Sequence, residues 1–190
     1  MQKILNDIRQ FLFLFLFFFP VILYSLNLPD NSIYHIDINM IDRYGKKIKL
    51  ADLAGKIHIF SMIYTNCKTI CPIIISNMKI LEQLIPKQYL NNISFLLISL
   101  DPERDTIYSL NKFFLEKKLN NDYWNIYKVS TTDVLKIALA TGIKYKKDKD
   151  NEYIHSNLII ILDKTGVIQL YHQGLDKNFD AVIKIISQLS

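Results

Sequence analysis

The stretch IHIFSMIYTNCKTICPIII, residues 57–75, decides the fold of this 190-residue chain. Its first part, residues 57–64, is a short apolar run that predicts a buried strand. Its last part opens a run from Ile73 to Ile85 in which apolar residues recur at helical spacing. Between them lie the chain's two cysteines, Cys67 and Cys71, followed by Pro72, which suits the first turn of a helix. The stretch therefore predicts a strand, a pair of thiols and a helix in succession.

The two cysteines indicate a local site rather than a disulfide framework, because a single closely spaced pair cannot staple a whole fold. At a helix start, unpaired backbone N–H groups and the helix dipole favour the thiolate. A thiolate is both the nucleophile of disulfide exchange and a ligand for soft metals. If Cys67 and Cys71 enter a helix, their spacing places both sulfurs on one face, where they can meet a metal ion or each other. Two buried structural cysteines are the alternative interpretation.

Strand and helix patterns alternate through the rest of the chain. Strands are predicted at 93–100 and 127–129 and in hairpins over 36–50 and 158–171; helices are predicted at 73–85, 105–119, 132–141 and 178–189. Early alternation, followed by a closing hairpin and helix, predicts an α/β fold. We expect residues 36–190 to form a thioredoxin-like sandwich with a mixed sheet.

A transmembrane helix is predicted ahead of this domain. Residues 11–28 are almost entirely apolar, and their number is at the lower end of the roughly 17–25 residues that span a bilayer. Lys3 and Arg9 precede this segment, which predicts residues 1–10 in the cytoplasm and the rest of the chain outside. Residues 29–35 are predicted to be a linker. A cleaved signal peptide is the alternative, but no small-residue cleavage site follows the apolar run.

The flanking sequence also indicates where such a protein resides. An Arg-rich amphipathic transit peptide is absent, which favours a bacterial protein over an organellar one. We therefore expect a single-pass protein of the bacterial inner membrane whose soluble domain faces the periplasm.

The charge pattern does not favour nucleic acid as a partner. The formal net charge is +5, from 23 basic and 18 acidic residues. The lysines are spread along the chain and form no basic stripe interleaved with aromatic residues. A solvated basic surface is the simpler interpretation.

His155 is the strongest candidate for a third ligand beside the cysteines. Of the other histidines, His58 lies within an apolar strand, His35 within the predicted linker, and His172 after the last strand, where exposure is expected. In a thioredoxin-like sheet the loop that holds His155 lies beside the active-site helix. Two thiolates and one imidazole favour copper, because soft sulfur selects Cu(I) and imidazole also suits Cu(II). A structural zinc site normally has four protein ligands, and no fourth is found here.

A polar stretch, DPERDT at residues 101–106, follows the predicted strand at 93–100. In an open α/β sheet, sites form at this carboxyl edge of the strands. The alternative is purely structural, because Asp105 or Thr106 can cap the helix that follows. In that interpretation Arg104 forms a surface ion pair that contributes little.

Three stretches together resemble the Sco/SenC family of copper-binding, thioredoxin-like proteins. They are YTNCKTICP at 64–72, the polar stretch at 101–106, and His155-Ser156 with the strand and turn that end at Gly166. The resemblance implies that Cys67, Cys71 and His155 bind one copper ion, as Cu(I) or Cu(II). It also implies assistance in assembling the dinuclear copper site of cytochrome c oxidase subunit II, by copper delivery or by reduction of its cysteines. A copper donor protein or a thiol reductant is then a further partner.

Other functions remain compatible with the cysteine pair. A thiol-disulfide oxidoreductase outside the cytoplasm needs only Cys67 and Cys71 and leaves His155 with no essential role. A thioredoxin more usually has Cys-x-x-Cys just after a tryptophan, whereas Trp124 here is far along the chain. A peroxidase on the same fold needs one cysteine of low pKa. The sequence favours a membrane-anchored copper chaperone over an enzyme in the strict sense.

Overall fold

The structure is a computed structural model that describes residues 28–149 and 152–190. The segment predicted to cross the membrane, residues 11–28, and residues 1–10, predicted to be cytoplasmic, lie outside the described residues, apart from Leu28. Within the described part of the chain, none of the helices is long and apolar enough to span a bilayer.

A seven-stranded mixed sheet lies at the centre of the domain, in the order β2-β1-β5-β4-β3-β8-β9. Its strands are β1 (Asn39–Asp42), β2 (Lys47–Lys49), β3 (Ile57–Ile63), β4 (Ile93–Ser99), β5 (Trp124–Lys128), β8 (Leu158–Leu162) and β9 (Ile168–Gln173). The pairs β3–β4 and β4–β5 are parallel, and the other neighbours are antiparallel. Every residue of β3 and β4 is buried, because both faces of the sheet are covered there.

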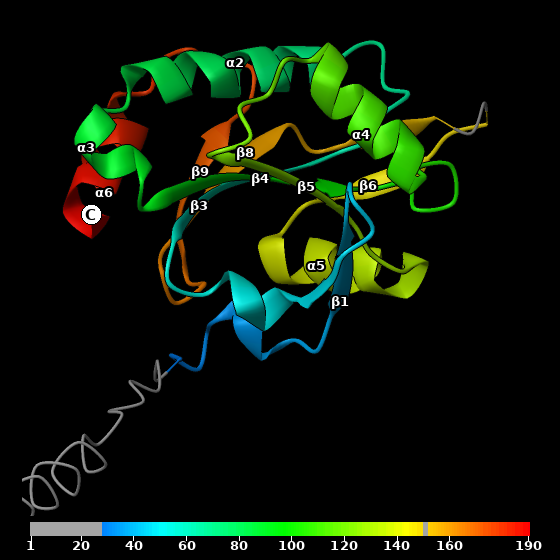
Figure 1. The fold of residues 1–190 in the computed structure, drawn as a ribbon, viewed down its shortest axis with the longest axis horizontal. Coiled ribbons are helices and arrows are strands. Elements are labelled where there is room, and N and C mark those ends of the chain that lie inside the picture. Colours follow the sequence, from blue (N-terminus) through cyan, green and yellow to red (C-terminus); the bar gives the residue numbers. More distant parts are fainter. Residues whose placement is uncertain (1–27, 150–151) are drawn as a thin grey trace, which may run out of the picture.

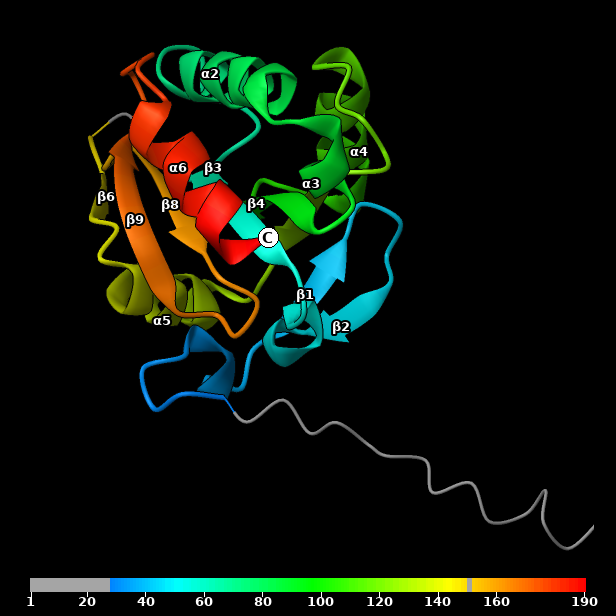
Figure 2. The same cartoon turned by 90° about the vertical axis from the view of Figure 1, so that its left-hand side faces the viewer.

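Helices cover both faces of this sheet and form two apolar cores (Figures 1 and 2). One face carries α2 (Cys71–Leu84), α3 (Lys87–Leu90), α4 (Ile107–Glu116) and α6 (Asp180–Leu189). The other carries α5 (Thr131–Thr141) and the short 3-10 helices η1 (Ile33–His35) and η2 (Leu50–Leu53). Alternation along β3 supplies both cores, with Ile59 on the first face and Phe60 on the second. The predicted thioredoxin-like α/β sandwich is confirmed.

The residues predicted as a linker, 29–35, pack against the domain. Ile33 and Tyr34 are buried in the second core, because their apolar side chains reach the sheet face there. The Ser32 hydroxyl donates to the carbonyl of Thr165, and the Ile33 N–H donates to the carbonyl of Gly166. The folded domain therefore begins before residue 36, where the sequence placed its start.

A small two-stranded sheet, absent from the sequence prediction, stands apart from the main sheet. It consists of β6 (Tyr145–Lys147) and β7 (Tyr153–His155), paired antiparallel with Tyr145 opposite His155. Its strands are short and rich in polar residues, so no apolar alternation marked them. This β6–β7 hairpin places His155 at the end of its second strand.

Candidate metal centre

The two cysteines lie where β3 ends and α2 begins, as the sequence predicted. Cys71 is the first residue of α2, two residues earlier than the predicted helix start, and Pro72 occupies its first turn. The backbone N–H of Cys71 donates to Cys67 Sγ at 3.4 Å. Both side chains are buried, Cys71 completely and Cys67 with 7% of its surface exposed. The helix start thus directs an N–H group at one of the two sulfurs.

His155 joins the cysteines from the β6–β7 hairpin. Its Nε2 lies 3.6 Å from Cys71 Sγ, and its Nδ1 lies 2.9 Å from the carbonyl oxygen of Ser156. A carbonyl oxygen only accepts, so Nδ1 carries the ring proton and Nε2 presents a free lone pair to the thiol. This orientation suits an imidazole that ligates a metal through Nε2.

The other three histidines bond to backbone carbonyls elsewhere in the domain. His35 contacts the carbonyl of Pro29, His58 that of Leu53 and His172 that of Asp176. The expectation that His172 is exposed was wrong. It lies within β9 and is buried against the ring of Phe179, with centroids 5.0 Å apart.

The pKa values of the two thiols shift in opposite directions. The pKa of Cys67 is well below the usual range, because hydrogen bonds from the Cys71 thiol and the Cys71 N–H stabilise its thiolate against the opposing effect of burial. The pKa of Cys71 is raised by the same hydrogen bond to Cys67 and by burial. Cys67 is therefore the more readily deprotonated of the two thiols.

The three predicted ligands are neighbours without forming a closed metal site. Among residues 28–149 and 152–190, no group of three or more His, Cys, Asp or Glu side chains lies close enough together to hold a metal ion. The donor set itself consists of two sulfurs and an imidazole nitrogen with a free lone pair, a combination suited to a soft or borderline cation. The ligand set Cys67, Cys71 and His155 stays a prediction.

The polar stretch at 101–106 supports the loop before Cys67. The pairing of β3 with β4 brings this stretch close to the loop before Cys67, since Ile63 at the end of β3 lies beside Ser99 at the end of β4. The buried carboxylate of Asp105 accepts hydrogen bonds from Thr65 and Ser99, and burial raises its pKa. Thr106 caps α4 by accepting from the Ser109 N–H. The structure therefore confirms the helix cap, and it shows in addition that Asp105 holds the loop before Cys67.

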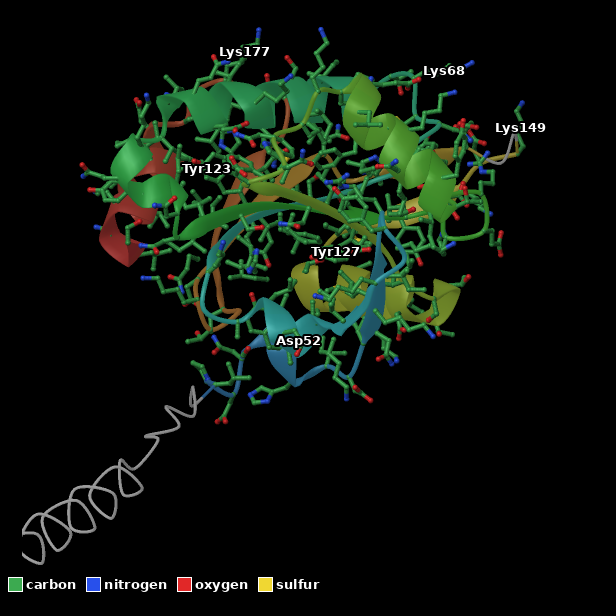
Figure 3. All side chains as sticks on the ribbon, viewed as in Figure 1. Asp52, Lys68, Tyr123, Tyr127, Lys149 and Lys177 are labelled. Atoms are coloured by element: carbon green, nitrogen blue, oxygen red, sulfur yellow. The ribbon has the colours of Figure 1, made fainter. Side chains whose placement is uncertain are left out.

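A hollow of about 460 Å³ separates the cysteine loop from the β6–β7 hairpin. Figure 3 shows Lys68, from the loop, extending into solvent at this end of the molecule, with Lys149 at the tip of the hairpin. Two lining residues, Tyr64 and Glu152, were not predicted to belong to the site. The residues that line the hollow are Tyr64, Asn66, Lys68, Thr69, Asp148, Glu152, Tyr153 and Ile154.

Comparison with known proteins gives consistent matches. The model of the SCO1/SenC family matches residues 29–190. The SCO1 protein homolog of Bacillus subtilis (strain 168) is 25% identical over 150 residues, which is 77% of this chain and 77% of that protein. The structure of Arabidopsis thaliana ScoI with copper bound has a TM-score of 0.70 at 22% identity, covering 80% of this chain and 98% of that one.

A second solved structure is that of BsSco, described as a member of the Sco family of cytochrome c oxidase assembly proteins in which a disulfide switch was identified. Its TM-score is 0.71 at 24% identity, covering 81% of this chain and 91% of that one. At these identities the two structures show that the fold is shared.

Proposed function

Because this chain belongs to the SCO1/SenC family, we propose that it binds copper and serves in the assembly of cytochrome c oxidase. The observation that carries this proposal is the approach of His155 Nε2 to Cys71 Sγ at 3.6 Å, with the Nδ1 proton held by Ser156. The copper-bound plant relative agrees with this choice of metal.

In this proposal Cys67, Cys71 and His155 hold one copper ion, as Cu(I) or Cu(II), which the protein carries as cargo. The lowered pKa of Cys67 favours its thiolate, and the imidazole, with Nδ1 bonded to the Ser156 carbonyl, offers Nε2. Binding through both sulfurs requires both thiols to be deprotonated, so copper uptake releases protons. The hollow between the cysteine loop and the β6–β7 hairpin is where a partner protein would dock.

The finer assignment is a membrane-anchored chaperone with its domain in the periplasm. Residues 11–28 would anchor it, and subunit II of cytochrome c oxidase would receive copper or have its cysteines reduced. The description of BsSco as an oxidase assembly protein supports this assignment. A copper donor protein or a thiol reductant would restore the chaperone after each cycle.

Metal content of the purified full chain tests the proposal. We expect about one copper per chain in the wild type, loss of copper in Cys67→Ala and Cys71→Ala, and strong weakening in His155→Ala. His35→Ala, which removes an exposed histidine at the opposite end of the domain, should bind as the wild type does. Full copper retention in His155→Ala would refute the three-ligand site.

The second candidate is a thiol-disulfide oxidoreductase that uses Cys67 and Cys71 without metal. The opposite pKa shifts of the two thiols favour it, because a thiolate beside a thiol is the reactive form of a redox pair. The two functions differ in their need for His155. If the His155→Ala variant restores oxidase assembly in cells that lack the protein, the oxidoreductase function is correct. If the variant fails to restore assembly while its Cys67–Cys71 pair keeps the wild-type reduction potential, copper binding is required.

A further inference from the structure

The β6–β7 hairpin cannot hold His155 in place by its own pairing. It has three paired residues on each strand and belongs to a sheet separate from the main one. An isolated two-stranded hairpin is at best marginally stable in water. The position of His155 relative to the cysteines therefore depends on what attaches the hairpin to the rest of the domain.

Glu152, the residue just before β7, accepts hydrogen bonds from two separate parts of the fold. The Tyr64 hydroxyl donates to its Oε2 at 2.9 Å, and Arg104 Nη1 donates to its Oε1 at 3.2 Å. Tyr64 comes directly after β3 and three residues before Cys67, whereas Arg104 belongs to the loop after β4. One carboxylate thus connects the hairpin both to the end of β3, just before the cysteine loop, and to the loop after β4.

Both donors are themselves firmly placed. Arg104 Nε donates to the carboxylate of Asp101, which is buried. Tyr64 is also buried, and its ring lies edge-on to His155 with centroids 6.4 Å apart. The Tyr153 ring also packs against the Tyr64 ring, with centroids 5.5 Å apart. Glu152 therefore connects the hairpin to a buried tyrosine and to an arginine that is paired with a buried carboxylate.

We propose that Glu152 is a positioning residue for the metal site, which sets how closely His155 Nε2 approaches Cys71 Sγ. This proposal rests on the proposed function, because it matters only if His155 is a ligand. Without the Glu152 carboxylate, the hairpin keeps its aromatic contacts and the exposed pair of Lys147 with Glu103 at 3.2 Å. Those contacts leave the hairpin free to swing away from the cysteines, which lowers affinity without removing any ligand.

The test compares Glu152→Ala with a matched control in the same region. Glu103→Ala removes the ion pair between Glu103 of the 101–106 loop and Lys147 of the hairpin. It leaves the hydrogen bonds from Tyr64 and Arg104 to Glu152 in place. Glu152→Gln keeps an oxygen that accepts from Tyr64 while losing the ion pair, so it should lie between wild type and Glu152→Ala. Each full-length variant is titrated with Cu(I) in competition with a chelator of known affinity.

We expect Glu152→Ala to bind Cu(I) about tenfold more weakly, the lower range seen when a partner behind a metal ligand is removed. The metal-free protein supplies a second readout. Amide hydrogen exchange of the hairpin, at Ser156 and Asp148, should quicken by a similar factor in Glu152→Ala and stay unchanged in Glu103→Ala. The Cu(II) absorption spectrum of Glu152→Ala should shift toward that of His155→Ala.

The outcomes separate this proposal from the proposed function. If His155→Ala binds copper as the wild type does, the ligand assignment itself fails. If His155→Ala loses affinity but Glu152→Ala matches the wild type in both affinity and exchange, the positioning role is refuted. Equal losses in Glu103→Ala and Glu152→Ala would also overturn it, since the effect would then be one of surface charge. Tyr64→Phe, which removes only the hydroxyl donor, should reproduce part of the Glu152→Ala effect.

Discussion

The carboxylate of Asp105 accepts hydrogen bonds from both the hydroxyl and the backbone N–H of Thr65. The hydroxyl bond is 2.5 Å long, and the N–H lies 3.2 Å and 3.3 Å from the two oxygens. Asp105 also accepts from the Ser99 hydroxyl at the end of β4. A single buried carboxylate thus fixes the chain two residues before Cys67.

Asp105→Ala should lower the free energy of unfolding by roughly 2–4 kcal/mol, because it leaves several buried donors without an acceptor. Urea denaturation of the full chain measures this loss. Glu103→Ala, two residues away but 63% exposed in its side chain, should change stability by no more than about 0.5 kcal/mol. Asp105→Asn keeps one acceptor oxygen and should fall between them; equal losses at positions 103 and 105 would contradict the role of burial.

Cys67 should react with iodoacetamide at least about ten times faster than Cys71 in the reduced, metal-free protein. The thiolate is the reacting form, and the pKa of Cys67 is lowered whereas that of Cys71 is raised. Cys71 is in addition fully buried. Mass mapping of singly alkylated chains identifies the modified residue. Preferential modification of Cys71 would show that the proton resides on the other sulfur.

Gly166→Ala should destabilise the domain more than Gly55→Ala. Both glycines have left-handed backbone, with φ of +81° and +99°, so alanine costs about 1 kcal/mol at either position. At Gly166 an added Cβ would lie 2.6 Å from the Tyr34 ring, whereas at Gly55 it would meet nothing within 4 Å. The clash should cost a further 1–3 kcal/mol or so, measured by chemical denaturation. Equal losses would mean that Tyr34 can move aside freely.

His58 should make the domain less stable as the pH falls below neutral. Burial lowers its pKa to about 4, and its Nδ1 is buried with no hydrogen-bond partner among the described residues. The unfolded chain, with a pKa near 6.5, then binds the proton more readily than the folded one. The stability that His58 contributes at neutral pH is lost between about pH 6.5 and pH 4, and amounts to roughly 3 kcal/mol.

Denaturation of His58→Gln across the same pH range checks this dependence. Glutamine can still donate to the Leu53 carbonyl but does not titrate, so the slope of stability against pH should flatten. His35→Gln changes an exposed ring and should keep the slope of the wild type. An unchanged slope in His58→Gln would assign the acid sensitivity to another group.

Local sequence was sufficient for most strands of the main sheet and for the placement of the cysteines, although the strand predicted at 127–129 runs from Trp124 to Lys128. The apolar run at 57–64 and the helical spacing after Pro72 are strong periodic signals, and the structure follows both. The contact of His155 with Cys71 was also foreseen, although 84 residues separate them. That inference needed a fold in which the loop before the closing hairpin lies beside the helix.

The support around the site could not be predicted in the same way. The β6–β7 hairpin has no apolar alternation, so its strands left no periodic signal. Glu152 gains its role from Tyr64 and Arg104, which lie 88 and 48 residues earlier, and neither partner is marked in sequence. His172 was expected to be exposed because the strand β9 was taken to end before it. Such relationships arise from tertiary packing and become visible only when the chain is folded.

The direction of β3 has a practical consequence for handling the protein. The strand begins near the turn at Gly166 and Ser32, where the described chain starts, and it ends at the cysteine loop (Figure 1). Seven residues of extended chain span about 23 Å. A protein attached through residues ahead of residue 28, by a purification tag or to a sensor surface, therefore has its cysteine loop on the side away from the attachment point. That side stays accessible to a partner protein.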